Sequence, residues 1–252
     1  LIVAGGRVAD IVARDALPPG IPCEDFDDGL IAPGFVDLQV NGGGGVMLND
    51  APTVETMARI AAAHAAFGTT SILPTLITDC DSATEAVIAA AQAAVAEGVA
   101  GIAGLHLEGP HLDPAKAGAH DPASIRPMGA ADIDRLCDAA AKLPVLMVTL
   151  APGAATPAQI ARLAAAGATV SLGHSAAGFD AARSAAEAGA SCVTHLFNAM
   201  SQVTARDPGL AGAALALPGL SAGLIADGIH VHPAVMAAAL RAKAGPGEIF
   251  LV

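Results

Sequence analysis

Apolar residues recur along the chain in short runs, separated by longer alanine-rich stretches whose apolar positions follow a helical spacing. The short runs predict eight strands, over residues 34–40, 70–76, 101–108, 144–150, 168–174, 191–197, 220–227 and 248–252. The longer stretches predict helices near residues 53–66, 82–97, 130–142, 156–166, 178–188 and 233–244. Strands that alternate with helices indicate a parallel sheet, because each helix returns the chain to the same edge.

Eight strands within roughly 220 residues favour a (β/α)8 barrel of the TIM type over an open doubly wound sheet. No G-x-G-x-x-G pattern stands between the first strand and a helix, which argues against a dinucleotide-binding fold. Residues 1–31 contain the strand-like segments LIVAGG and RVADIVA and predict a small partial β-sandwich domain, too short to fold alone. We therefore expect an α/β chain in which residues 32–252 form a barrel that is truncated at strand 8.

Two helix starts carry a capping-box pattern, in which a hydroxyl residue is followed three positions later by Glu or Gln. One is Ser82 with Glu85, and the other is Thr156 with Gln159. The second also has Pro157 at the first helical position, where a missing N–H costs nothing.

Composition narrows the possible partners. The chain has 252 residues, a formal net charge of -12 and no Trp or Tyr, which argues against nucleic acid or an anionic membrane as a partner. Four scattered cysteines without C-x-x-C spacing favour reduced thiols in a cytoplasmic protein. No apolar run is long enough for a membrane span and no leader pattern is visible. The chain lacks an initiator Met and stops inside EIFLV, so both ends look cut.

The candidate chemistry lies at strand ends, where barrel enzymes place their working residues. Glu108 ends the third predicted strand, His174 ends the fifth, and His195 lies near the end of the sixth. One carboxylate and two imidazoles from separate strand ends predict a mononuclear metal site with an open position for water. The competing interpretation is a hydrogen-bonded network in the mouth of the barrel.

Four other histidines receive less weight as ligands. His64 lies in a predicted helix, and His106 shares a strand face with Glu108 but lies one layer deeper, as expected of a hydrogen-bonded core histidine. His111 follows in a loop where it could equally be solvated. His232 lacks the glycine-flanked strand-end setting of His230.

The loop over residues 109–128 is unusually long, and loops of that size are commonly functional or disordered. Its His120 could reach over the barrel mouth. Arg206 is the only basic residue between Arg183 and Arg241. It is either a solvated loop charge or a clamp for phosphate or carboxylate.

Several motifs together resemble the N-acetylglucosamine-6-phosphate deacetylase family of the amidohydrolase superfamily. They occur in the family's order over residues 32–252: PGFVDLQVNGGGG, GTTSILPT, GLHLEGPHLDPAKAGAHDP, VSLGHS, THLFNAM, DPGLAGA and GLIADGIHVHP. The combination of H-L-E-G-P with T-H-L-x-N-A-M is highly specific. The resemblance implies that Glu108, His174 and His195 are the metal ligands, the same three that strand-end placement selects.

The resemblance also implies a substrate site. His120 would help to polarise the acetamide carbonyl, with Ala119 beside it. The sugar phosphate would be contacted by Asn198, Ala199, Arg206 and His230. A neighbouring subunit supplies part of the phosphate site in this family, so a homodimer is implied. The resemblance further implies that C-terminal strands, which this chain lacks, complete the small β domain.

The first strand ends in Gln39-Val40-Asn41, where other superfamily members have His-x-His for a second metal. Amide oxygens are weak zinc ligands, so one divalent metal ion is expected, with zinc the best fit and iron, cobalt or manganese possible. The family's general acid/base, an Asp after strand 8, would follow Val252. No catalytic residue of that kind is therefore expected within these 252 residues, and we hypothesise that only the complete protein is active.

The resulting hypothesis is a metal-dependent deacetylase that converts N-acetylglucosamine 6-phosphate to glucosamine 6-phosphate and acetate. A deacetylase for the galactosamine epimer, or another amidohydrolase acting on a cyclic amide, would use the same three ligands. A non-catalytic protein that binds a phosphosugar is the alternative from a different class.

Overall fold

The computed structural model describes residues 1–252, which form two compact units, Leu1–Pro33 and Gly34–Val252. In the first unit, β1 (Ile2–Ala4) and β2 (Arg7–Asp10) form an antiparallel pair, followed by the 3-10 turn η1 (Arg14–Ala16). Apolar side chains of this pair are exposed, among them Val3 and Val8. The unit therefore has little core of its own, and its completion by other strands stays a prediction.

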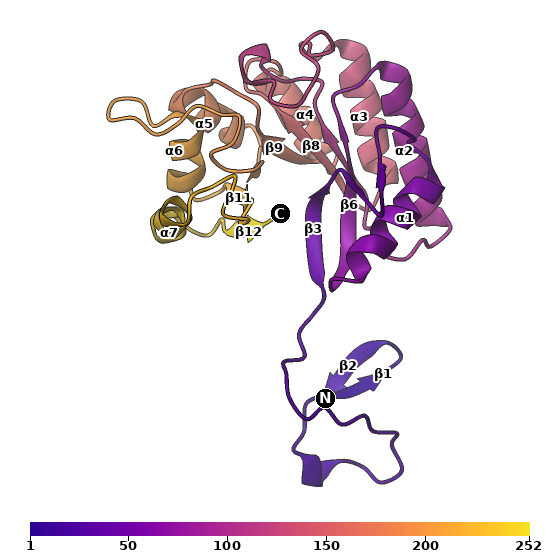
Figure 1. The fold of residues 1–252 in the computed structure, drawn as a ribbon. Coiled ribbons are helices and arrows are strands. Elements are labelled where there is room, and N and C mark those ends of the chain that lie inside the picture. The colour runs from indigo at the N-terminus through magenta and orange to yellow at the C-terminus, as the bar shows by residue number, and fades with distance from the viewer. The chain divides into compact units, whose positions relative to one another are not determined.

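The second unit is built on one eight-stranded parallel sheet, in the order β12-β11-β10-β9-β8-β7-β6-β3 (Figure 1). Its strands are β3 (Phe35–Val40), β6 (Thr69–Ile77), β7 (Leu105–Glu108), β8 (Leu146–Leu150), β9 (Thr169–Leu172), β10 (Cys192–Val193), β11 (Ser221–Leu224) and β12 (Ile249–Leu251). A short antiparallel pair, β4 (Gly42–Gly43) and β5 (Val46–Met47), follows β3. The predicted barrel is confirmed as a nearly closed one, in which β3 and β12 are the two edges.

Seven helices connect the eight strands. They are α1 (Val54–Ala65), α2 (Asp81–Ala96), α3 (Ala130–Lys142), α4 (Pro157–Ala165), α5 (Phe179–Glu187), α6 (Gly209–Ala216) and α7 (Pro233–Ala242), with a 3-10 turn η2 (Pro114–Lys116) between β7 and α3. The helix α6 was not predicted, because its sequence GLAGAALA has two glycines and no polar face. Its residues are nearly all buried, so packing rather than amphipathic pattern stabilises it.

One of the two predicted capping boxes forms. Thr156 and Gln159 exchange the expected bonds at the start of α4. The prediction for Ser82 is wrong, because α2 begins one residue earlier with Cys80 as its cap. Ser82 instead lies inside the first turn, where its hydroxyl oxygen is 3.1 Å from the Cys80 sulfur.

The predicted strand over residues 191–197 is much shorter in the structure. Only Cys192–Val193 pairs with its neighbours, and the backbone then turns, with positive φ at His195, Phe197 and Ala199. The alternation of apolar residues in SCVTHLF continued into this turn, so the strand end was placed too late. This turn begins at the carboxyl end of β10, and it places His195 at the edge of the sheet where the other strand ends lie.

The main core fills the space between the sheet and the helices. A smaller cluster of Leu73, Met147 and Cys192 lies apart from it, with Leu38 and Phe250 packed against it. These residues come from five different strands, and layers of this kind fill the inside of a barrel. No helix of the chain is both long and apolar enough to cross a lipid bilayer.

Candidate metal centre

Glu108 is the last residue of β7, and it is buried. His174 follows β9 by two residues and His195 follows β10 by two residues, and both are buried. The three residues come together because the carboxyl ends of parallel strands meet at one edge of the sheet.

The three side chains converge on one point. The Nε2 atoms of His174 and His195 each lie 3.1 Å from Glu108 Oε1. The two Nε2 atoms lie 2.9 Å from each other. The convergence that strand-end placement predicted is therefore present in the structure, and binding of a metal by these atoms stays a prediction.

The proton positions explain why this cluster suits a cation. His174 Nδ1 lies 2.8 Å from the carbonyl oxygen of Lys116, which can only accept, so Nδ1 is the protonated nitrogen. In a neutral ring, His174 Nε2 then has a bare lone pair directed at a carboxylate oxygen and at another imidazole nitrogen. Such a set needs a positive charge, supplied by extra protons or by a metal ion. Tetrahedral zinc ligands at about 2.0–2.1 Å from the ion lie about 3.3 Å apart, close to the separations here.

Two further details support an incomplete site. His195 Nδ1 is a buried nitrogen with no hydrogen-bond partner. Burial would by itself raise the pKa of Glu108, but positive charge on the two imidazoles beside it would hold that pKa well below its ordinary value. The carboxylate is thus charged and available as a ligand.

The backbone at the two histidines is unusual. His174 has a φ of 45° and His195 a φ of 33°, in the left-handed region that side chains other than glycine rarely adopt. Main-chain bonds from Asp113 N to His174 O and from Asn198 N to His195 O hold these turns. Backbone strain of this kind is found mostly at functional sites.

A β-bulge aims Gln39 at the cluster. The three steps from Asp37 to Val40 match two steps along β6, so β3 contains one extra residue. Gln39 Nε2 donates to Glu108 Oε2 over 3.1 Å. The amide is thus a hydrogen-bond donor to the carboxylate here, and its expected weakness as a metal ligand stays a prediction.

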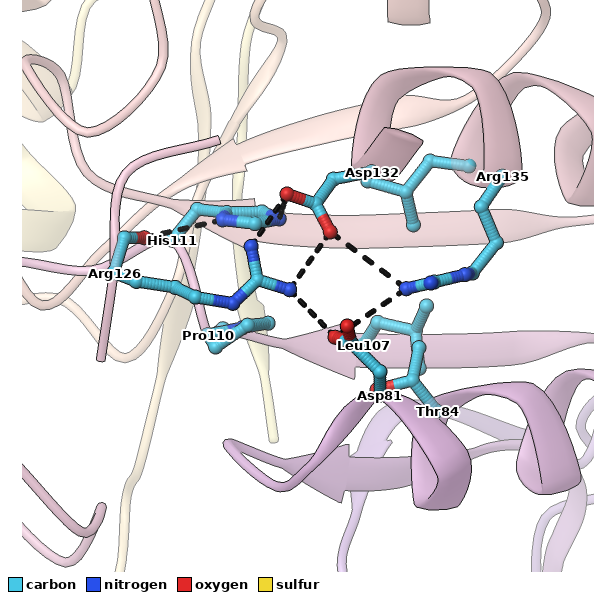
Figure 2. Close-up of a pocket in the computed structure, with 10 residues that line it drawn as sticks. Asp81, Thr84, Leu107, Pro110, His111, Arg126, Asp132 and Arg135 are labelled. Atoms are coloured by element: carbon cyan, nitrogen blue, oxygen red, sulfur yellow. Dashed lines mark hydrogen bonds and ion pairs between the residues drawn. The ribbon is translucent and has the colours of Figure 1, made fainter. Parts of the chain in front are cut away.

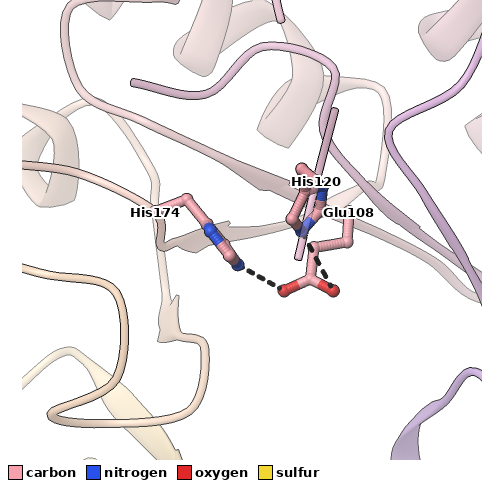
Figure 3. Close-up of side chains that lie close together, drawn as sticks. All are labelled: Glu108, His120 and His174. Atoms are coloured by element: carbon pink, nitrogen blue, oxygen red, sulfur yellow. Dashed lines mark hydrogen bonds and ion pairs between the residues drawn. The ribbon is translucent and has the colours of Figure 1, made fainter. Parts of the chain in front are cut away.

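His120 also reaches this cluster, although it lies in the loop between β7 and α3. It is buried, and its Nε2 is 3.8 Å from Glu108 Oε2 (Figure 3). Ligand atoms of Glu108, His120 and His174 lie within 4.8 Å of one another, so geometry offers a second possible trio. We favour His195 over His120 as the third ligand, because its nitrogen is closer to both partners. Burial lowers the pKa of His120 to about 4.

Only some of the predicted substrate-binding residues lie near the cluster of Glu108, His174 and His195. Ala119 is exposed beside His120, and Asn198 and Ala199 are half-buried in the turn after His195. Ala199 O accepts from Ser175 N, next to His174.

The last two predicted phosphate contacts lie on exposed segments. Arg206 has no hydrogen bond or ion pair in the structure. His230 Nδ1 lies 2.7 Å from Asp227 Oδ2, and no contact joins either residue to the cluster. Their roles in binding phosphate stay predictions.

Beneath the cluster lies a polar layer that sequence reasoning missed except for His106. The ring of His106 lies between Thr75 Oγ1 at 3.2 Å and Thr149 Oγ1 at 2.7 Å. Thr194 continues the chain of hydroxyls, at 2.7 Å from Thr149 and 2.6 Å from Ser171. All five are buried, and the signal was a hydroxyl residue at an inward position of successive strands. This layer fixes the strands directly below the candidate ligands.

The other histidines have structural partners. His64 Nε2 lies 3.0 Å from Gly42 O, and His232 caps α7 by accepting from Ala234 N. His111 is buried, and its Nδ1 donates to Arg126 O over 3.2 Å. The possibility that His111 is solvated is therefore excluded.

His111 borders a charged network that the sequence did not predict (Figure 2). Arg126 contacts Asp132 at 2.8 Å and Asp81 at 2.6 Å. Arg135 lies 3.5 Å from Asp81 and 3.6 Å from Asp132. The network joins the starts of α2 and α3 to the long loop, and so it anchors the segment that contains His120.

Comparison with known proteins places this geometry in a family. Residues 30–247 match the sequence pattern of the amidohydrolase family. An N-acetylgalactosamine-6-phosphate deacetylase of Shewanella sp. (strain ANA-3) is 48% identical over 224 residues, covering 89% of this chain and 56% of the relative. An N-acetylglucosamine-6-phosphate deacetylase of Danio rerio is 40% identical over 242 residues, covering 90% and 58%.

The solved structures agree. The crystal structure of N-acetylglucosamine-6-phosphate deacetylase from Pasteurella multocida superposes with a TM-score of 0.82 at 36% identity, covering 87% of this chain and 57% of that one. The chain thus spans between 56% and 58% of the length of these three proteins. Because the family pattern extends over most of its residues, this chain belongs to the amidohydrolase family.

Proposed function

We propose that this chain belongs to a metal-dependent deacetylase that hydrolyses N-acetylglucosamine 6-phosphate to glucosamine 6-phosphate and acetate. The observation behind the proposal is the convergence of Glu108 Oε1, His174 Nε2 and His195 Nε2 within 2.9–3.1 Å of one another. The relatives named N-acetylglucosamine-6-phosphate deacetylase support the choice of substrate.

Glu108, His174 and His195 would hold one divalent ion, for which zinc suits two imidazoles and a carboxylate best. Iron, cobalt or manganese would also fit this donor set. When bound, such an ion supplies Lewis acidity that lowers the pKa of a water to about 7. Gln39 orients Glu108 by donating to Oε2, which leaves Oε1 to face the imidazoles.

His120 would act on the carbonyl oxygen of the substrate's acetamide group. Its Nε2 is directed into the same space as the Glu108 carboxylate, where an acetamide oxygen would receive its hydrogen bond. That oxygen gains negative charge as water adds to the carbonyl carbon, so a fixed donor there stabilises the transition state. The attacking water would lose a proton to the acid/base Asp that the family resemblance implies, which would pass it to the leaving nitrogen, so that cleavage of the C–N bond gives acetate and the free amine.

Ala119 would line the site beside His120. Asn198, Ala199, Arg206 and His230 would bind the sugar phosphate. In a chain of net charge -12, an anionic substrate needs local donors of this kind. Part of the phosphate site would come from the second subunit of a homodimer. A phosphorylated sugar as substrate and four free cysteines favour the cytoplasm.

A second candidate is the galactosamine epimer, because the relative at 48% identity is named N-acetylgalactosamine-6-phosphate deacetylase. The two epimers differ at one hydroxyl, and a single buried partner for that hydroxyl would decide between them. Acetate release from each sugar phosphate, measured side by side on the same preparation, separates the two candidates.

The decisive experiment uses the complete protein to which this chain belongs, purified without added metal. Elemental analysis should find about one divalent ion per chain, and acetate should appear on adding N-acetylglucosamine 6-phosphate. The unphosphorylated sugar is the matched control and should react far more slowly. Binding of the sugar phosphate without acetate release, by protein with a full complement of metal, would indicate a non-catalytic phosphosugar-binding protein instead.

A further inference from the structure

The ring of His120 has polar neighbours at both edges and is hydrogen-bonded at one of them. On one edge, Nδ1 lies 3.2 Å from the backbone nitrogen of Thr78 and 2.7 Å from the Thr78 hydroxyl oxygen. On the other edge, Nε2 is 3.8 Å from Glu108 Oε2. The ring meets His174 edge to face, with centroids 4.3 Å apart and an interplanar angle of 67°. Thr78 follows directly on β6 and is itself buried.

The contacts at Nδ1 decide where the proton of His120 is. A backbone N–H can only donate, so the Nδ1 that accepts from Thr78 N has no proton of its own. The Thr78 hydroxyl must then also donate to Nδ1. A neutral imidazole has one N–H, and for His120 it is therefore at Nε2, on the side of the candidate metal centre.

His174 has the opposite arrangement. Its Nδ1 faces the Lys116 carbonyl oxygen, which only accepts, so the proton is at Nδ1 and Nε2 is bare. The protein thus fixes two neighbouring imidazoles in different tautomers. A bare nitrogen is a metal ligand, whereas a protonated nitrogen is a hydrogen-bond donor.

We propose that Thr78 is a positioning residue, which fixes His120 as an Nε2–H donor to the substrate carbonyl oxygen and keeps it out of the metal's ligand set. The proposal rests on the proposed function for the identity of the acceptor. The tautomer itself follows from the contacts of Thr78 alone. This tautomer also favours one of the two possible sets of metal ligands. The Glu108–His120–His174 set would need His120 Nε2 as a ligand, and this tautomer protonates that nitrogen.

Gly109 supports this role of Thr78. A Cβ atom at residue 109 would collide with the Thr78 hydroxyl oxygen. Gly109 also has a φ of 85°, a conformation that side chains disfavour. A glycine after Glu108 therefore leaves the space in which the hydroxyl reaches His120.

The test combines ring ¹⁵N spectra with kinetics. In protein labelled with ¹⁵N-histidine, the signals of His120 are assigned by their loss in His120→Asn. They should show a protonated Nε2 and an unprotonated Nδ1 that accepts hydrogen bonds. In Thr78→Val, which keeps the shape but removes the hydroxyl, the Nδ1 signal should move to a less hydrogen-bonded position. The rate constant kcat should fall about 10-fold with little change in KM, as for loss of one hydrogen bond.

Matched variants separate positioning from loss of fold. Thr78→Ser keeps the hydroxyl and should restore both the Nδ1 signal and kcat. Thr78→Val and His120→Asn should each retain about one metal ion per chain, whereas His174→Ala should lose it. Gly109→Ala, which displaces the hydroxyl without altering Thr78, should reproduce the spectral change of Thr78→Val.

Three results would overturn the proposal: a wild-type His120 protonated at Nδ1, loss of metal in His120→Asn, or wild-type kcat in Thr78→Val. The wild-type spectrum decides the tautomer even if every Thr78 variant is unstable. Failure of the proposed function has a different signature, since the wild-type protein would then release no acetate from either sugar phosphate. The spectra and the metal content would still decide the tautomer and the ligand set.

Discussion

Two polar clusters, one partly exposed and one largely buried, share the segment that follows β7. One pairs Arg126 with Asp132 and Asp81, and every charge in it faces an opposite charge (Figure 2). The other directs the lone pairs of Glu108 and His174 at each other (Figure 3) and at a third acceptor, His195 Nε2. Both clusters contain a buried histidine and a carboxylate, so composition alone does not separate them.

The difference lies in whether the groups satisfy one another. In the charged network, guanidinium donors meet carboxylate acceptors, and the network is complete with the protein's own atoms. At the candidate metal centre, acceptors face acceptors, and His195 Nδ1 has no partner. A buried set of this kind needs added positive charge, from extra protons or from a bound cation. The first cluster is therefore expected to stabilise the fold, and the second to bind a ligand.

The largest expected effect is loss of the third ligand. His195→Ala should abolish metal retention and lower the rate of acetate release at least about 1000-fold, because water would no longer be activated. Elemental analysis and an acetate assay measure the two effects. His232→Asn, which keeps the cap of α7, is the control and should retain metal. Stoichiometric metal in His195→Ala would remove this residue from the ligand set.

A smaller effect is expected in the charged network. Asp132→Ala leaves Arg126 and Arg135 without their shared carboxylate and removes the acceptor for Gly129 N. The free energy of unfolding, measured by urea denaturation, should fall by about 1–2 kcal/mol, because water can solvate the partly exposed Arg126. Metal content should be unchanged. Loss of metal from folded Asp132→Ala, at urea concentrations below the unfolding transition, would show that the charged network and the candidate metal centre are not independent.

The same carboxyl group should contribute a pH dependence. The hydrogen bonds from Arg126 lower the pKa of Asp132 from 3.8 to about 2. A lowered pKa stabilises the fold above the unfolded-state pKa, and this stabilisation is lost as the pH falls through the folded-state pKa. The difference in unfolding free energy between wild type and Asp132→Asn should therefore shrink, by up to about 2 kcal/mol, as pH falls from 5 toward 2. A difference that is constant over this range would refute the assignment.

The smallest effect is expected at Gln39, which is not itself a candidate ligand but donates a hydrogen bond to the candidate ligand Glu108. Gln39→Leu removes the donor to Glu108 Oε2 and should weaken metal affinity about 10-fold, measured by competition with a chelator. Gln92→Leu, on the outer helix α2, is the control and should leave the affinity unchanged. A complete loss of metal in Gln39→Leu would instead make the amide a ligand.

The alternation of strands and helices could be predicted from the sequence, because apolar periodicity reflects which face of each element is buried. The helix over residues 130–142 has the same bounds in the structure as in the prediction. The apolar helix α6 and the end of β10 could not be placed, since packing and backbone turns override periodicity there. The polar layer around Thr149 and Thr194 was also missed, because inward hydroxyl residues on successive strands become a signal only once the neighbouring strands are known.

The apolar pattern of the sequence is enough to predict the parallel (β/α)8 order, and with it the edge at which Glu108, His174 and His195 gather, because parallel strands end on the same side. What each imidazole can do at that edge depends on contacts that form only when the chain folds. The tautomers of His120 and His174 depend on whether a donor from Thr78 or an acceptor from Lys116 faces Nδ1. These partners are 42 and 58 residues away along the chain, and no local pattern in the sequence encodes such contacts.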